Sequence, residues 1–318
     1  MRTRLLMLVA AVSLASSVAS RTGAAAESTA APAEAASSAS ESTSKSGALP
    51  QVTVMGRLKL ESKVAGFVHG ITAPENQEGL ARWNQPVCPQ VSGLPREEGE
   101  FILARVSEIA RAAGVRLGSE ECRANLYIFV TNQPRELLRA MERRNRSVTF
   151  NGAAQVVVDE FIDTPRAVRV WYNSYKTAPG GVPLTPRLPA DTQFVGNALT
   201  ATPLLFVSAP EGGSRLTRTV VWAFSYVYVV VDQTQLRSLS RRQLADYVGM
   251  ISLAQIKRFA RPGDTRTILN LFTGAPEDAP AGMSDWDQLF LKSLYATDQQ
   301  SVTQRSLIAR SMVRGIVR

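Results

Sequence analysis

The sequence predicts an α+β fold, in which helices pack on a mixed β-sheet. Residues 125–131 and 218–232 are rich in β-branched and aromatic side chains, which favour buried strands. Apolar residues recur at the helical period in three further segments, residues 97–114, 240–261 and 284–296. We therefore expect one globular domain over residues 51–298.

The first nineteen residues have the pattern of a cleavable export signal. Arg2 and Arg4 precede an apolar run, which ends in the small residues Ser17-Val18-Ala19. Cleavage near Ala19 predicts a periplasmic or secreted protein. The alternative is a signal retained as a membrane anchor, although the run is shorter than the ~20 apolar residues that span a bilayer. Residues 20–50 are mostly Ala, Ser, Thr, Glu and Gly and predict a disordered linker.

The first half of the domain predicts five elements in order. Residues 51–60 alternate apolar and polar side chains, which indicates a strand. Residues 97–114 form a helix that Gly114 caps, residues 125–131 a buried strand, residues 134–146 a second helix, and residues 155–158 another strand.

The second half is expected to begin with a strand at residues 168–172. A segment rich in Pro, Gly and Thr follows from residue 175 to 210 and predicts a long loop or an elaborated hairpin. Residues 218–232 predict one long bent strand or two short ones at the centre of the sheet. Ser240 is a suitable N-cap for a helix that Pro262-Gly263 would stop, and the acidic residues after Ser284 favour the start of a last helix.

The basic charge is concentrated at the two ends of the chain. The formal net charge is +9, but the export signal supplies two arginines and residues 299–318 supply four, with no acidic residue in either segment. The main domain therefore lacks the excess of basic residues that nucleic-acid binding requires, so we expect no nucleic-acid partner.

Two cysteines, Cys88 and Cys122, are present. An even pair in an exported protein predicts a disulfide, which would close a loop of roughly 35 residues. The alternatives are two free thiols or a metal pair, but a thiolate metal site usually needs more ligands.

Several familiar chemistries are missing from the sequence. His69 is the single histidine, and there is no Gly-x-Ser-x-Gly elbow, P-loop or dinucleotide fingerprint. We therefore expect no metal and no cofactor. The acidic residues Asp159, Glu160 and Asp163 lie close together, and could serve a hydrolase or a hard cation. The other interpretation of this cluster is a solvated turn.

Two segments carry a family resemblance. A strand that ends in Val229-Val230-Val231-Asp232 leads into a helix with Leu244-Ala245-Asp246-Tyr247-Val248-Gly249-Met250, and Ser284, Asp287, Leu291, Leu294 and Tyr295 follow later. This order resembles the catalytic half of zincin, particularly metzincin-like, metalloproteases. With Arg82-Trp83-Asn84-Gln85-Pro86-Val87-Cys88-Pro89, it is also similar to a secreted proteobacterial family without an assigned activity.

The resemblance implies a scaffold without the zinc-binding histidines. Asp246 falls at the first histidine, Tyr247 at the glutamate, Gly249 at the glycine and Met250 at the second histidine. A Met thioether is a poor zinc ligand, and no carboxylate occupies the general-base position. Asp246 and Tyr247 then become candidate binding residues. The alternative is an amphipathic helix whose Gly249 permits close packing, followed by a Ser-x-x-Asp capping signature.

The last twenty residues alternate apolar side chains with Arg305, Arg310, Arg314 and Arg318. On a helix this pattern gives an apolar stripe with a basic flank, suited to an anionic membrane surface or a partner groove. The other interpretation is a last helix packed on its own domain.

The sequence favours an exported, non-catalytic binding or interaction protein of the cell envelope, with an unknown protein or envelope component as partner. One alternative is a hydrolase with an unrecognised carboxylate or metal site at Asp159, Glu160, Asp163 and Asp246. Another is a protein that acts on a membrane surface through its C-terminal arginines.

Overall fold

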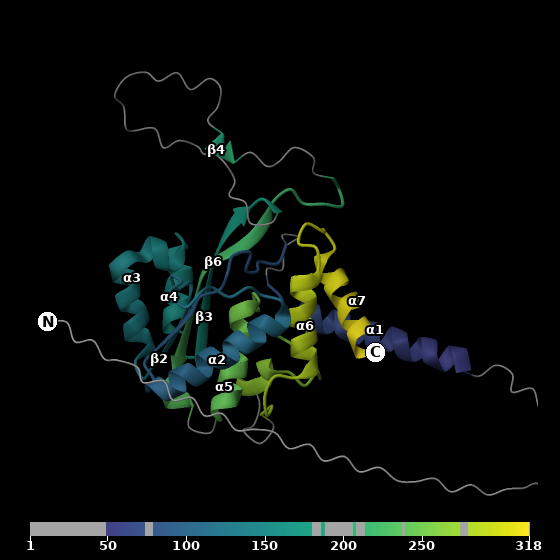
Figure 1. The fold of residues 1–318 in the computed structure, drawn as a ribbon, viewed down its shortest axis with the longest axis horizontal. Helices are drawn as coiled ribbons and strands as arrows, with labels where there is room; N and C mark the ends of the chain where they lie inside the picture. Colours follow the sequence, from purple (N-terminus) through teal and green to yellow (C-terminus); the bar gives the residue numbers. More distant parts are fainter. Residues whose placement is uncertain are drawn as a thin grey trace, which may run out of the picture. The chain divides into compact units, whose positions relative to one another are not determined.

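A computed structural model describes residues 49–73, 79–179, 186–187, 206–207, 214–236, 239–273 and 279–317. Figure 1 shows how these segments are arranged. The expected export signal and almost all of the expected linker lie outside them, as does Arg318. Residues 48–318 form one unit, so the C-terminal segment belongs to the same unit as the expected domain.

The predicted mixed sheet is present and has four strands. They are β1 (Pro89–Ser92), β2 (Leu126–Thr131), β3 (Val168–Thr177) and β6 (Val221–Asp232), in the spatial order β1-β2-β6-β3. β1, β2 and β6 are parallel, and β3 runs antiparallel to β6 at the edge of the sheet. The short β4 (Pro186–Arg187) and β5 (Phe206–Val207) pair with each other.

The sheet has helices on both faces. Alternate residues of β2 and β6, such as Ile128 and Val229, point into the main core, which α2 (Arg96–Ala113) and α5 (Arg241–Leu253) help to close. This core also takes in residues of α1 (Leu49–Ile71), α6 (Asp285–Ala296) and α7 (Gln304–Ile316). Val230 points the other way, into a smaller core with α3 (Pro134–Phe150) and α4 (Gln155–Asp163). Figure 1 shows α3 and α4 together, away from α6 and α7.

Local signals placed several helix ends correctly. Gly114 ends α2 with φ of 84°, a left-handed conformation that suits glycine. Ser240 begins α5 and Ser284 begins α6, each through a capping box that satisfies otherwise unpaired N–H groups. Two short 3-10 helices, η2 (Gln233–Gln235) and η3 (Ile268–Phe272), complete the described elements.

The predicted disulfide joins Cys88 to Cys122. Cys88 precedes β1, and Cys122 lies shortly before β2. Asn125 reinforces this connection, because its side chain accepts a hydrogen bond from the Cys88 N–H at 2.8 Å and donates one to the Pro86 carbonyl at 3.0 Å. The bridge therefore ties the starts of two neighbouring strands together.

Two predicted strands are helices. Residues 51–60 belong to α1, whose buried residues Val64, Phe67, Val68 and Ile71 follow the helical spacing. Residues 155–158 belong to α4, where Val158, Phe161 and Ile162 pack toward the second core. For residues 51–60 the apolar residues that decide the structure lie downstream of the short alternation, and for residues 155–158 they extend past the segment to Phe161 and Ile162, so a period judged over a few residues is misleading.

α5 ends at Leu253, eight residues before the predicted stop at Arg261. The Tyr172 hydroxyl lies 2.8 Å from the Ile251 carbonyl and 3.0 Å from that of Ala254. The next residues pair with the end of α1, where Lys257 donates its backbone N–H to the Ile71 carbonyl at 2.8 Å. Tertiary contacts thus replace the last turns of the expected helix.

The C-terminal segment is a helix packed on its own domain. Ile308, Met312 and Val313 of α7 are buried in the main core, while Arg310 and Arg314 are exposed. The apolar stripe seen in the sequence therefore faces inward. Among the described residues, no helix combines the length and apolar character needed to cross a membrane.

Candidate functional site

Asp246 is a buried carboxylate with a full set of partners. Its side chain is 0 % exposed. One oxygen accepts a hydrogen bond from Arg105 Nε at 2.5 Å, and the other accepts one from the Met283 backbone N–H at 2.8 Å. Arg242 Nε lies 3.8 Å from that second oxygen. Asp246 therefore holds α2, α5 and the segment before α6 together.

The other motif residues of α5 do not converge with Asp246. Met250 is 0 % exposed within the core. Gly249 lies against α2, because a Cβ at this position would stand 2.6 Å from Ile109 Cδ1; close helix packing is thus one reason for this glycine. Tyr247 lies edge-to-face with Phe272, at 4.8 Å between ring centroids, and burial raises its pKa to about 12.

The Ser-x-x-Asp pattern before α6 forms a structural network. Asp287 is 0 % exposed and accepts hydrogen bonds from the Ser284 N–H and hydroxyl, both at 2.8 Å. It also accepts from the Thr267 hydroxyl and from the Ile268 N–H. Burial raises the pKa of this carboxyl above its ordinary value, although these bonds oppose the shift. The network fixes η3 against the start of α6.

The three acidic residues proposed from the sequence share α4 but are paired with arginines. Arg139 lies 2.6 Å from Asp159 and 2.7 Å from Asp163. Arg258 lies 2.6 Å from Glu160. The hydrogen bond from Arg139 lowers the pKa of the Asp159 carboxyl. Within the described ranges, no three His, Cys, Asp or Glu side chains are grouped to hold a metal ion.

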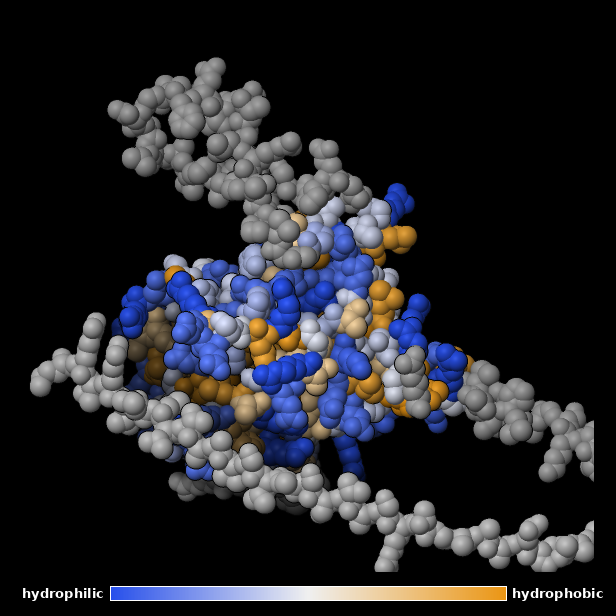
Figure 2. All heavy atoms as spheres, in the orientation of Figure 1, coloured by the Kyte–Doolittle hydropathy of each residue, from blue (hydrophilic) through white to orange (hydrophobic). Residues whose placement is uncertain are grey.

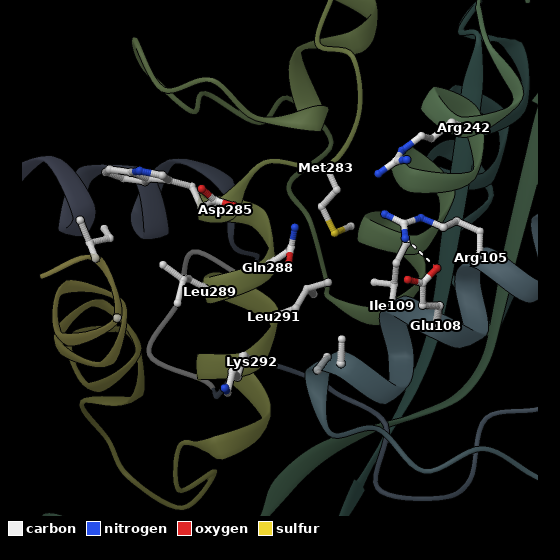
Figure 3. A pocket seen from close by; sticks show the side chains of 15 residues that line it. Arg105, Glu108, Ile109, Arg242, Met283, Asp285, Gln288, Leu289, Leu291 and Lys292 are labelled. Atoms are coloured by element: carbon white, nitrogen blue, oxygen red, sulfur yellow. Dashed lines mark hydrogen bonds and ion pairs between the residues drawn. The ribbon is translucent and has the colours of Figure 1, made fainter. Parts of the chain in front are cut away.

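A groove of about 820 Å³ opens beside the Asp246 ion pair (Figure 3). α2 contributes Arg105, Glu108 and Ile109, α5 contributes Arg242, and α6 contributes Gln288, Leu289 and Lys292. Figure 3 shows Met283 between the α2 and α6 sides, and the Arg105 guanidinium near Glu108. The lining thus combines apolar side chains with charges of both signs. This groove was not predicted from the sequence.

A second groove, of about 290 Å³, runs along edge strand β3. Edge strand β3, Tyr247 and Ile251 of α5, Val157 and Phe161 of α4, and the segment after α5 line it. Four of its side chains are cationic: Arg166, Arg169, Lys257 and Arg258. Tyr247 is the sequence-predicted binding residue that lines a groove here. The sequence signal for this groove is the spacing of Arg166 and Arg169 around the start of β3.

A third groove, of about 410 Å³, separates α1 from α7. Its lining includes Arg57, His69, Arg305, Arg310 and Arg314, so three of the four arginines singled out at the C-terminus meet here. Glu61 contributes a carboxylate to the same lining and lies 3.1 Å from Arg57. His69 is exposed, as an ordinary surface histidine would be.

In comparisons with protein-family models, curated proteins and solved structures, nothing matches this chain.

Proposed function

We propose that this chain is an exported, non-catalytic binding protein of the cell envelope, and that a segment of a partner protein lies in the groove of Figure 3. The observation that carries the proposal is the position of Asp246. Asp246, the residue at the place of the first zinc ligand, forms a buried ion pair with Arg105, and Arg105 in turn lines the groove.

The proposal includes a degenerate metalloprotease-like scaffold, and the order of the elements supports that part of it. β6 leads into α5, and α6 follows downstream and joins the same core, as the metalloprotease resemblance implies. On this scaffold Asp246 stabilises the helix packing and offers no free oxygen to a metal or a water. We therefore assign binding, and not hydrolysis, to the face that α2 and α6 share.

The groove lining supports a protein segment as the ligand. Ile109, Met283 and Leu289 supply apolar surface, while Arg242, Lys292 and Glu108 supply charges of both signs. Interfaces between proteins combine an apolar centre with a polar rim in this way. Figure 2 shows mostly hydrophilic side chains on the face in view, with hydrophobic ones in small patches. An amphipathic helix lying in the groove is the mode of recognition that fits.

Export follows from the sequence and is consistent with the disulfide, since oxidising compartments favour disulfides. The hydrolase alternative ranks lower because Asp159, Glu160, Asp163 and Asp246 are all paired with arginines. The membrane alternative ranks lower because the apolar stripe of α7 is buried, which leaves its exposed arginines as the means of contact.

The test is photo-crosslinking in cells that export the full chain. A photoreactive residue replaces Gln288, which is exposed in the groove, and in a matched control it replaces Glu136, which is exposed on α3. We expect a discrete protein adduct from position 288 and none from position 136. Adding Leu289→Arg should reduce the adduct at least fivefold.

Two results would overturn the proposal. One is an adduct pattern that is the same at positions 288 and 136. The other is peptidase activity of the pure protein that Asp246→Asn abolishes while the variant remains folded by circular dichroism.

A further inference from the structure

The lining of the groove between β3 and α5 includes a buried arginine. Arg169 is 3 % exposed. Its Nη1 donates to the Arg166 carbonyl at 3.1 Å, its Nη2 donates to the Thr164 carbonyl at 3.0 Å, and its Nε has no partner. Within the described residues Arg169 makes no ion pair. A guanidinium has five N–H donors, so donors remain for a ligand.

The neighbouring charges add to the excess. Arg166 also makes no ion pair among the described residues; it donates to the Arg258 carbonyl at 3.0 Å and lies over the Phe259 ring at 4.7 Å. Arg258 is balanced by Glu160 alone. Asp232 is the carboxylate whose charge acts on Arg169, and burial still lowers the pKa of this guanidinium.

Burying the Arg169 guanidinium without a direct ion pair costs folding free energy. A charge taken out of water is costly unless a partner of opposite sign and good hydrogen bonds compensate it. Native proteins pair most buried polar atoms, and Arg169, whose Nε is buried without a partner, lines the groove, so an anion bound there would complete the hydrogen bonds of its guanidinium. A planar or tetrahedral oxyanion is the acceptor that the arginine fork fits best.

We propose that the β3–α5 groove is a binding site for an oxyanion, a carboxylate or phosphate, attached to an apolar body. Arg169 and Arg166 hold the anionic group. Phe161, Val170 and Ile251 line the same groove and contact the apolar body. This site is separate from the groove of Figure 3, so it does not depend on the proposed partner.

The test measures the melting temperature of the chain without residues 1–19, with added anions at constant ionic strength. The probes are inorganic phosphate, acetate and N-acetylphenylalanine, with chloride as the reference. A ligand at about ten times its Kd should raise the Tm by about 2–5 °C. N-acetylphenylalanine should exceed acetate, because its ring adds apolar contact. Whichever of phosphate and the two carboxylates raises the Tm more identifies the class of anion that the groove binds.

Three variants separate binding from folding. Arg169→Met and Arg166→Gln should lose at least three quarters of the anion-dependent Tm shift. Arg123→Gln removes an exposed arginine outside this groove and should keep the whole shift. Should Arg169→Met fail to fold, Arg166→Gln and the next measurement decide the question.

In the wild-type protein, the indole N–H resonance of Trp171, which lines the groove, should shift saturably with the best probe. An adventitious ion only, with equal small shifts in all variants and no saturable change at Trp171, overturns the proposal. The proposal is also overturned if Arg123→Gln reduces the anion-dependent Tm shift as much as Arg169→Met does.

Discussion

The protein treats two buried charges differently. On the side of α2, Asp246 is 0 % exposed and meets Arg105 at 2.5 Å and the Met283 N–H at 2.8 Å. On β3, Arg169 is 3 % exposed; its side chain donates to carbonyls and makes no ion pair among the described residues. Both side chains have lost almost all of their water, yet only Asp246 has a direct ion pair.

The difference separates a structural charge from one that is available to a ligand. The partners of Asp246 come from α2, α5 and the start of α6, so its ion pair is part of the packing of the helices. The side-chain hydrogen bonds of Arg169 go to the carbonyls of Thr164 and Arg166, which are near it in the sequence. Removing the first charge should therefore loosen the helices, while removing the second should alter what the groove accepts.

The largest effect is expected from Asp246→Asn. Breaking a fully buried ion pair costs about 3–5 kcal/mol, but the stranded Arg105 keeps Glu108 at 2.7 Å and is partly exposed. We therefore expect a loss of about 2–3 kcal/mol in the free energy of unfolding, measured by urea denaturation.

The matched control is Asp285→Asn, since Asp285 is exposed in the first turn of α6. It should cost less than about 1 kcal/mol, the worth of a favourable charge at a helix terminus. Equal losses of unfolding free energy in the two variants would show that the Asp246 ion pair does not hold α2, α5 and the segment before α6 together.

A smaller effect is expected from Gly249→Ala, which tests how closely α2 and α5 pack. The added Cβ would meet Ile109 Cδ1 at 2.6 Å, the flexible end of a side chain that can turn aside. We expect a loss of about 1–2 kcal/mol, because overpacking outweighs the better helix propensity of alanine. Ile109→Val in the same chain should recover part of the loss. A gain in stability from Gly249→Ala alone would contradict the close contact.

The sequence allowed the class of the fold to be predicted, because its main signals are local. The β-branched run of β6, the glycine after α2 and the serines before α5 and α6 each act within a few residues. The strand predicted at residues 51–60 is wrong because distant contacts decide the structure there. Their alternation is overruled by contacts that Phe67 and Ile71, a turn or more further on, make in the core.

The grooves could not be predicted from the sequence, because their walls come from distant segments. Arg105 and Asp246 are 141 positions apart, and Arg166 and the Arg258 carbonyl are 92 apart. The resemblance singled out Asp246 and Tyr247 as neighbours, but consecutive residues of a helix point about 100° apart, so Asp246 meets Arg105 while Tyr247 meets Phe272. Counting charges along the sequence does not show which charged side chains pair with one another or which are buried.

The smallest effect at neutral pH is expected from Tyr247→Phe, on the β3 side of α5. Burial raises the pKa of Tyr247 to about 12, and it raises the pKa of Tyr172 and Tyr295 as well. An unfolded chain ionises its phenols from about pH 10, so this part of the stability is present below pH 10 and is lost as the pH rises toward 12.

Tyr247→Phe should leave the free energy of unfolding at pH 7 within about 0.5 kcal/mol of wild type, and should make its decline above pH 10 shallower. Tyr172→Phe is the contrast, because it also removes the hydroxyl that bonds the Ile251 and Ala254 carbonyls, and it should cost about 1–3 kcal/mol already at pH 7. Parallel curves for wild type and Tyr247→Phe between pH 9 and 11 would mean that water reaches the phenol. The groove would then be wet beside Tyr247, and the high dielectric constant of water would weaken the attraction of the nearby Arg166 for an anion.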